Sequence, residues 1–245
     1  MKKIVYFILV ASLALSSLFA LDSCSTSKHS TTRNGELGVP NYKQIKKKIG
    51  SKGNEFYYPE LLRRFETADT SMTVEQYYYF YYGTATRPDY NPYQGSNYDE
   101  LREALRGDTL TKDNWRRAAQ AIEKQLKSDP TNLRFHVYKQ IAYSNLYGED
   151  SMEANNSYMQ AIMLYFAIRA TGDGQSPETA FHVICTTDEY GLMEMLGLSP
   201  KSQSLIEKNG RSYDVMELEE NEIGLESMYF DVTVGMEALN KMFGY

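Results

Sequence analysis

Cysteine and histidine are scarce in this sequence of 245 residues, which contains two cysteines, Cys24 and Cys185, and three histidines. Two cysteines cannot form a cysteine-rich zinc site, and the histidines follow neither the HExxH motif nor another paired spacing. We therefore expect neither a metal nor a cofactor. The candidate metal ligands that this expectation sets aside are His136, His182, Asp173, Asp188 and Glu189.

Basic residues are also in the minority, because 26 lysines and arginines stand against 32 aspartates and glutamates, which gives a net charge of −6. Proteins that bind nucleic acids need a basic surface to neutralise phosphates, so this charge argues against a nucleic-acid partner. The Walker A motif and the glycine fingerprint of dinucleotide-binding proteins are absent as well. The sequence therefore gives no support for nucleotide binding.

The N-terminus has the pattern of a bacterial secretion signal. Lys2 and Lys3 precede an uncharged, mostly apolar stretch at residues 4–20. The next four residues, Leu21-Asp22-Ser23-Cys24, resemble a lipobox, with leucine three residues before the cysteine and a small residue directly before it. Asp22 departs from that pattern, because a small or apolar residue is usual at its position.

These features predict a signal peptide at 1–23 and a flexible, lipid-anchored tether at 24–40, with the lipid on Cys24. The alternative is cleavage after Ala20, which would leave no lipid anchor. The first interpretation predicts an exported protein whose partner is a membrane of the bacterial cell envelope, with the outer membrane or the periplasm as its location.

Three consecutive segments have the apolar spacing of amphipathic helices. Apolar residues recur three and four positions apart in 115–126, and similar spacing returns in 133–147 and 159–170 after an Asp-Pro break at 129–130. This succession of helices and short turns resembles tetratricopeptide packing over about one and a half units. A solenoid needs more units than that, so we expect a helical bundle with a tetratricopeptide-like hairpin.

The apolar period changes after Gly172. Asn209-Gly210 predicts a tight hairpin turn, because such turns require positive φ angles. The strands predicted from β-branched and aromatic residues are 181–187, 203–207, 211–218 and 228–234, and the accompanying helices are 188–196 and 236–243.

The whole pattern predicts one α+β domain at 41–245. Residues 41–171 are expected to be mainly helical, and 172–245 to contain a small antiparallel sheet on which the helices pack.

Several motifs together resemble one protein family. They are Glu75–Gly83 (EQYYYFYYG), Tyr90–Tyr93 (YNPY), Thr171–Ile184 (TGDGQSPETAFHVI) and Asp188–Tyr190 (DEY). They resemble a family of exported bacterial proteins, domain of unknown function 4919. The resemblance implies an envelope protein, and it implies no activity and no catalytic residue.

Tyrosine is abundant, with 21 residues. We expect the aromatic run 77–82 to lie in the core, because a helix that is aromatic on every side is normally buried. Tyr90 and Tyr93 lie in a loop that contains Pro88 and Pro92, which would hold them rigidly at the surface. They are the candidate contacts of a non-catalytic module that binds a peptide, a protein or a glycan.

The alternative hypothesis is a hydrolase centred on the Gly-Asp-Gly turn at Asp173. In it, His182, Asp188 and Glu189 would supply the acid–base groups, and the turn would offer N–H groups to a developing charge. Cys185 is not part of this site, because strand alternation would place its side chain in the core, on the face opposite His182.

Overall fold

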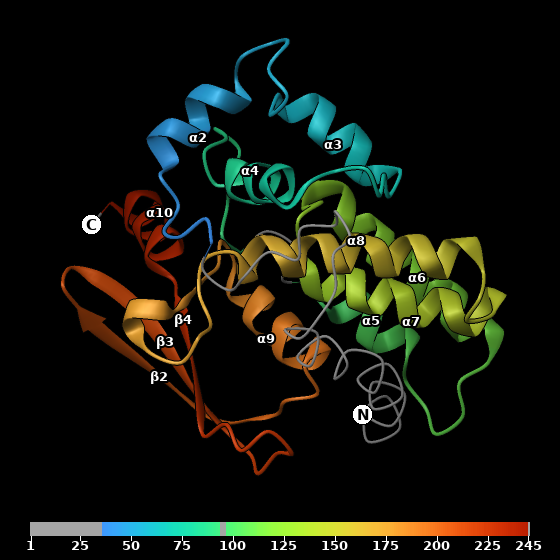
Figure 1. Cartoon of the computed structure of the whole chain (residues 1–245). Helices are drawn as coiled ribbons and strands as arrows, with labels where there is room; N and C mark the ends of the chain where they lie inside the picture. The colour runs from blue at the N-terminus through green and yellow to red at the C-terminus, as the bar shows by residue number, and fades with distance from the viewer. Residues whose placement is uncertain (1–35, 94–96, 245) are drawn as a thin grey trace, which may run out of the picture.

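The computed structural model describes residues 36–93 and 97–244 (Figure 1). The predicted signal peptide, most of the tether and Cys24 lie outside these residues. The helices of the N-terminal part are α2 (Tyr42–Ile49), α3 (Tyr58–Glu66), α4 (Val74–Thr84), α5 (Asp99–Ala104), α6 (Lys112–Ser128), α7 (Leu133–Tyr147) and α8 (Met152–Arg169). None of the helices described is long and apolar enough to cross a membrane.

Side-chain caps fix where these helices begin. Thr73 and Gln76 form a reciprocal capping box at the start of α4, and Thr111 forms another with Asn114 at the start of α6. Asn132 and Ser151 cap α7 and α8 by accepting a hydrogen bond from a backbone N–H of the first turn. The predicted helical hairpins are confirmed, and α7 packs between α6 and α8.

The C-terminal part contains a 3-10 turn η2 (Pro177–Thr179), strands β1 (Phe181–His182), β2 (Pro200–Lys208), β3 (Arg211–Leu218) and β4 (Ser227–Asp231), and helices α9 (Thr186–Met195) and α10 (Thr233–Phe243). The strand order is β1-β4-β3-β2. The predicted antiparallel pairing is right for β2, β3 and β4, and β1 adds to β4 in parallel, so the sheet is mixed. The fold is α+β, with the helices first and the sheet last.

The strand predicted at 181–187 is wrong beyond His182. Ile184 donates its N–H to the hydroxyl of Tyr81 and accepts the hydroxyl of Tyr90 at its carbonyl, so these groups bind side chains rather than another strand. Helix α9 therefore begins at Thr186, two residues before the predicted start.

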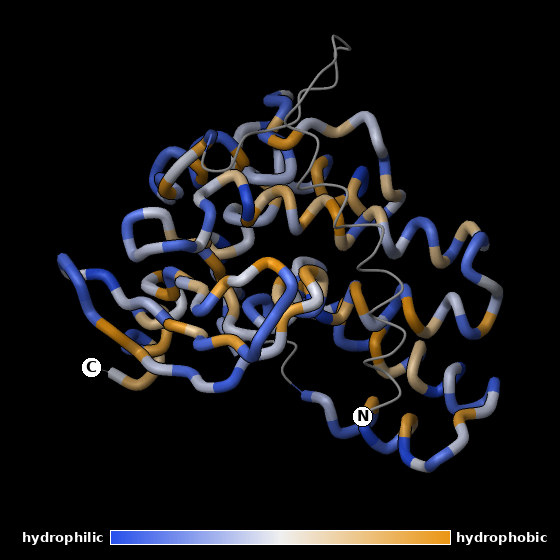
Figure 2. Tube along the Cα trace, turned by 60° about the horizontal axis from the view of Figure 1, so that its bottom comes forward, coloured by the Kyte–Doolittle hydropathy of each residue, from blue (hydrophilic) through white to orange (hydrophobic). Residues whose placement is uncertain are grey.

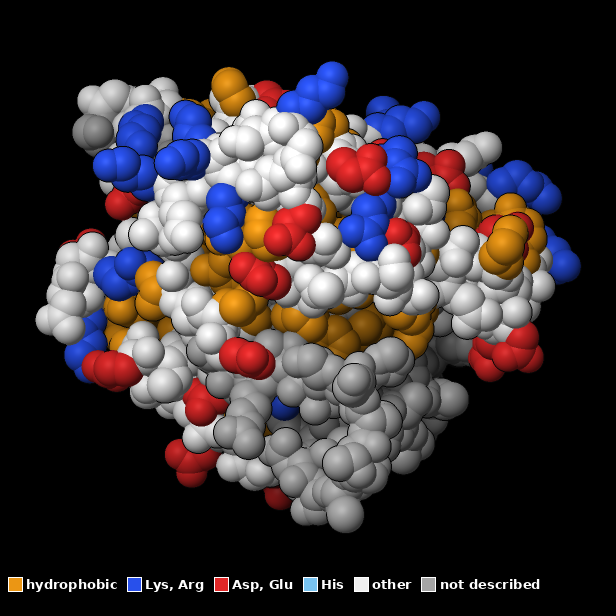
Figure 3. All heavy atoms as spheres, turned by 45° about the horizontal axis from the view of Figure 1, so that its top comes forward, with side chains coloured by type: hydrophobic (Ala, Val, Ile, Leu, Met, Phe, Trp, Pro, Cys, Tyr) orange, Lys and Arg blue, Asp and Glu red, His pale blue; other side chains and the backbone are white. Residues whose placement is uncertain are grey.

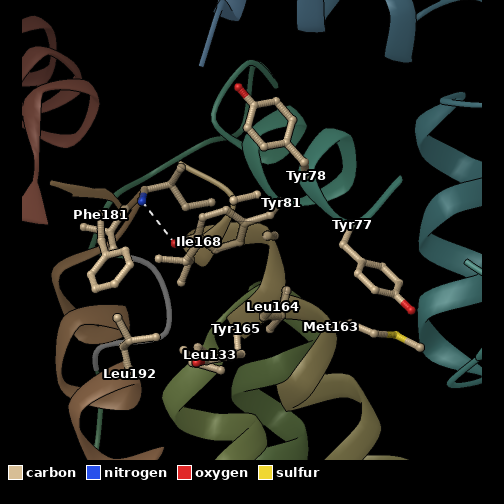
Figure 4. Close-up of a cluster of buried hydrophobic side chains, with 14 of the residues drawn as sticks. Tyr77, Tyr78, Tyr81, Leu133, Met163, Leu164, Tyr165, Ile168, Phe181 and Leu192 are labelled. Carbon is tan, nitrogen blue, oxygen red and sulfur yellow. Dashed lines mark hydrogen bonds between the residues drawn. The ribbon is translucent and has the colours of Figure 1, made fainter. Parts of the chain in front are cut away.

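The aromatic run of α4 lies in the core, as predicted. All six residues at 77–82 are at most 8% exposed, and α4 packs against α2, α3 and α8. Figure 4 shows Tyr77, Tyr78 and Tyr81 leaving α4 in different directions, so one helix serves several parts of the core. The main cluster of buried hydrophobic residues extends from α2 to β4, and a second cluster lies among α5, α6 and α7.

The surface is mixed in charge and hydropathy. On the face in Figure 3, basic and acidic side chains alternate, and hydrophobic side chains form a band across the centre. Figure 2 shows the tip of the β2–β3 hairpin as hydrophilic.

Candidate functional site

The motifs that carry the family resemblance contact one another in the interior. Tyr81 on α4 donates its hydroxyl proton to Asp188 Oδ2 on α9 at 2.6 Å and accepts the N–H of Ile184 at 3.2 Å. Asp188 Oδ1 accepts the N–H of Leu133, the first residue of α7, at 2.8 Å. We call Tyr81, Ile184, Asp188 and Leu133 the Asp188 cluster. It joins α4, α7 and α9 at one point.

Asp188 is 1% exposed, and burial raises the pKa of its carboxyl to about 8. The nearby carboxylate of Asp129 raises this pKa further, and the hydrogen bonds from Tyr81 and Leu133 lower it. A carboxylate at this position also lies favourably at the positive end of α7. Each Asp188 oxygen thus has a structural partner.

Glu189, the next residue, is buried without such partners. It is 0% exposed, and among the described residues neither carboxylate oxygen has a hydrogen-bond partner within bonding geometry. Burial raises its pKa well above the ordinary value, and the neighbouring carboxyl of Asp214 raises it further. Asp214 itself accepts a hydrogen bond from Gln203 on β2 at 2.7 Å. The result is a pair of acidic groups between α9 and the sheet that favours the protonated form.

His182 belongs to a different cluster, on the opposite side of the sheet from Glu189. Its Nδ1 lies 3.3 Å from Arg211 Nη2 and 3.8 Å from Asp231 Oδ1, and Arg211 Nε donates to Asp231 Oδ2 at 2.5 Å. Burial lowers the pKa of His182 to about 4, and Arg211 lowers it while Asp231 opposes the shift. Because arginine can only donate, Nδ1 of this neutral ring is the acceptor.

The turn at Asp173 is held by internal hydrogen bonds. The N–H groups of Asp173 and Gly174 both donate to the carbonyl of Thr179, at 3.0 and 2.8 Å, and Asp173 Oδ1 accepts the N–H of Gln175. A Cβ on Gly172 would lie 2.1 Å from the same Thr179 oxygen, so glycine is required there by close packing. Of the four residues of the hydrolase hypothesis, Asp173, His182 and Asp188 thus have separate partners, and Glu189 has no hydrogen-bond partner among the described residues.

Cys185 is buried, as predicted, although for another reason. It occupies the N-cap position of α9 rather than a strand, and it is 7% exposed. Its thiol donates to the carbonyl of Pro92 at 3.0 Å and lies 3.0 Å from Thr187 Oγ1. Burial raises the pKa of this thiol, which disfavours the nucleophilic thiolate.

The two loop tyrosines differ in exposure. Tyr93 is 52% exposed, whereas Tyr90 is half-buried and holds the loop to the carbonyl of Ile184. Tyr90 borders a pocket of about 370 Å³ between α3, the end of α4, the loop and the turn before α7. We call this the Arg87 pocket. Its lining includes Tyr58, Glu66, Arg87, Tyr90, Lys127, Asp129 and Cys185.

The Arg87 pocket combines aromatic and charged groups. The guanidinium of Arg87 lies 4.8 Å from the ring centre of Tyr58 and pairs with Asp89, an arrangement that raises the pKa of Arg87. Asp129 accepts hydrogen bonds from Thr131 and Asn132, while burial raises its pKa. The pocket therefore offers both donors and acceptors of hydrogen bonds.

No sequence pattern identifies Arg87, Tyr58 or Asp129 as a site residue. Arg87 opens the proline-containing loop and Asp129 stands at the Asp-Pro break, so both segments were identified as irregular. The tertiary fold brings these residues together, and a local sequence pattern does not predict such contacts. Among the residues that the structure describes, no group of three or more histidines, cysteines and acidic residues could hold a metal ion.

Among the comparisons with known proteins, only the comparison with family models finds a match. No curated protein and no solved structure matches this chain. A family model, in contrast, matches residues 43–241, which include every motif of the interior contacts described above. The chain belongs to the family described as Domain of unknown function (DUF4919).

Proposed function

We propose that this protein is a non-catalytic binding module of the bacterial cell envelope. Its Arg87 pocket binds a peptide, a segment of a protein or a glycan. The observation that carries the proposal is the pocket itself, a concave site of about 370 Å³ beside the loop whose tyrosines were the candidate contacts.

The lining of the pocket suits ligands that carry both donors and acceptors. Arg87 and Lys127 provide donors, Glu66 and Asp129 provide acceptors, and Tyr58 contributes an aromatic surface. A peptide backbone and a sugar ring both present such mixed groups. Exposed Tyr93 would extend the contact area along the loop.

The hydrolase alternative has less support. It requires the N–H groups at Asp173 and Gly174 to face a substrate, whereas both donate to Thr179. It also requires His182 to work with Asp188 or Glu189, whereas the charged neighbours of His182 are Arg211 and Asp231.

The pocket is tested by titrating the protein with short peptides and with oligosaccharides in a calorimeter. We expect one of these two classes to bind, and we expect Arg87→Ala to weaken that binding at least about tenfold. The matched control is Arg102→Ala on α5. It also removes an arginine that pairs with an aspartate, but at an exposed position that does not line the pocket. If neither class binds, or if both variants bind as the unchanged protein does, the proposed function is wrong.

The envelope location includes a lipid anchor on Cys24, proposed from the secretion signal and the lipobox-like residues. Cys24→Ala is expected to release the protein from the membrane fraction. A mature protein that begins at Leu21 and carries no acyl group would contradict the anchor while leaving the pocket open to its own test.

A further inference from the structure

Positive charge is concentrated in helix α2 and the turn that follows it. Residues 37–54 contain five lysines and no acidic residue, although the net charge of the whole chain is −6. Four of these lysines are exposed, and we call them the α2 lysines. They are Lys43, Lys46, Lys47 and Lys52. Basic side chains outnumber acidic ones at the upper left of the molecule in Figure 3, the side on which α2 lies in Figure 1.

The packing of α2 turns three of these lysines away from the core. Helix α2 packs on α4, and its two buried residues are Ile45 and Ile49. Lys43 and Lys47 each precede a buried isoleucine by two positions, which places them about 200° from it around the helix. Lys46 is three positions from Lys43, so it shares their side of the helix. The outer side of α2 is therefore basic.

The α2 lysines lack the acidic partners that other basic side chains have. On the next helix, Arg63 pairs with Glu60 at 2.6 Å, and the fifth lysine of the segment, Lys48, lies 3.9 Å from Glu75. Within residues 36–93 and 97–244, no acidic side chain forms an ion pair with any of the α2 lysines. A surface of unpaired positive charge attracts a polyanion.

The position of α2 in the chain favours a membrane as this polyanion. Seventeen residues separate Cys24, the proposed site of the lipid anchor, from Tyr42 at the start of α2. A chain of that length reaches at most about 60 Å when fully extended. Among the described helices, α2 is therefore the one that follows the anchor most closely in sequence. Basic residues beside an anionic bilayer add to the attachment that an acyl group provides.

We propose that the α2 lysines bind the surface of a bilayer that contains anionic phospholipids, so that α2 faces the membrane to which the chain is anchored. The attraction is electrostatic, between the ammonium groups and the lipid phosphates, and Ile45 and Ile49 stay in the core. The proposal rests on the envelope location in the proposed function. It does not rest on the Arg87 pocket, because no α2 lysine lines that pocket.

Vesicle binding tests the α2 lysines without the lipid anchor. The chain from residue 24 onward, with Cys24→Ser, should sediment with vesicles made of equal parts phosphatidylglycerol and phosphatidylcholine, and not with vesicles of phosphatidylcholine alone. Binding should fall at least about tenfold when salt is raised from about 0.05 to about 0.5 M, because salt screens the charges. No binding, or equal binding to both kinds of vesicle, overturns the proposal and leaves the Cys24 anchor and the pocket to their own tests.

Charge reversal tests whether the α2 lysines form the contact. Lys46→Glu combined with Lys47→Glu should weaken vesicle binding at least about tenfold. The matched control is Lys112→Glu combined with Lys201→Glu, which reverses two exposed lysines on α6 and β2 and changes the net charge equally. The control should bind within about twofold of the unchanged protein. Equal binding by the two reversal variants overturns the proposal.

Neutralisation guards against a loss of binding that comes from damage to the helix. Lys46→Gln combined with Lys47→Gln removes both charges without introducing a carboxylate at the end of α2, and thermal unfolding checks that the fold is kept. This variant should weaken vesicle binding about fivefold or more. A folded glutamine variant that binds as the unchanged protein does also overturns the proposal.

Discussion

The connector at 171–190 and the β2–β3 hairpin neighbour each other in sequence, yet they are held in opposite ways. The connector is fixed from the inside, because side chains of α4 bind its backbone and Asp188 binds the start of α7. The hairpin is fixed by its own ladder and its turn, and β2 faces solvent. The comparison shows that side chains of the motifs behind the family resemblance form hydrogen bonds that connect separate elements in the interior. The structure of the exposed hairpin depends on few specific side chains.

The first prediction concerns pH and should show the largest effect. Burial raises the folded-state pKa of Asp188 from 3.8 to about 8, so its protonated form is favoured in the folded protein. The stability associated with that proton is complete below pH ~4 and is lost as pH rises through 8. Glu189 acts in the same direction, since its pKa is raised as well.

Asp188→Asn, which keeps the shape and removes the charge, should therefore match the unchanged protein at pH 4 and exceed its unfolding free energy at pH 8, on the order of several kcal/mol. Denaturant unfolding across this range measures the difference. In the hairpin, Glu207→Gln is the control, because it removes a carboxyl group from an exposed position. Parallel profiles for Asp188→Asn and the unchanged protein would show that Asp188 does not carry this linkage.

The second prediction compares two glycines. Gly172→Ala places a Cβ 2.1 Å from the carbonyl oxygen of Thr179. This oxygen must then move, which breaks the two hydrogen bonds that it accepts from backbone N–H groups. We expect a loss of about 3 kcal/mol in unfolding free energy. At the hairpin turn, Gly210→Ala meets open space and should cost only about 1 kcal/mol, from its positive φ angle. Equal losses in urea titrations would mean that the connector is no more tightly packed than the turn.

Much of this contrast follows from local sequence signals. The apolar spacing of α6 to α8 predicts their helices because it repeats within each segment, and Asn209-Gly210 predicts the hairpin because the turn requires positive φ at adjacent positions. The burial of the aromatic run 77–82 also follows from its composition alone.

The connector could not be predicted in this way. Its strand ends early because hydroxyl groups about 100 residues away, on Tyr81 and Tyr90, bind the backbone of Ile184. The Arg87 pocket likewise combines segments that are distant in sequence. Local propensity describes one segment at a time, so it predicts neither the hydrogen bonds to Ile184 nor the assembly of the pocket.

The third prediction compares two tyrosine hydroxyls of the same motifs. Tyr81→Phe removes a buried hydroxyl that donates a hydrogen bond to Asp188 and accepts one from the N–H of Ile184, so both hydrogen bonds are lost. The expected loss is about 2 kcal/mol. Tyr190→Phe removes a hydroxyl that reaches Gln203 of the hairpin at an exposed position, and it should cost less than about 0.5 kcal/mol. Thermal unfolding of the two variants would contradict the contrast if Tyr190→Phe cost as much as Tyr81→Phe.

The fourth prediction has the smallest expected effect. Leu205→Ser should change the unfolding free energy of the monomer by less than about 0.5 kcal/mol, because Leu205 is 51% exposed on the outer strand. Leu192→Ala on α9, which is 0% exposed, should cost about 3 kcal/mol by leaving a cavity. Denaturant unfolding measures both losses. A large loss for Leu205→Ser would show that Leu205 contributes to the folded protein like a core residue, and the hairpin would then resemble the connector with which it is contrasted.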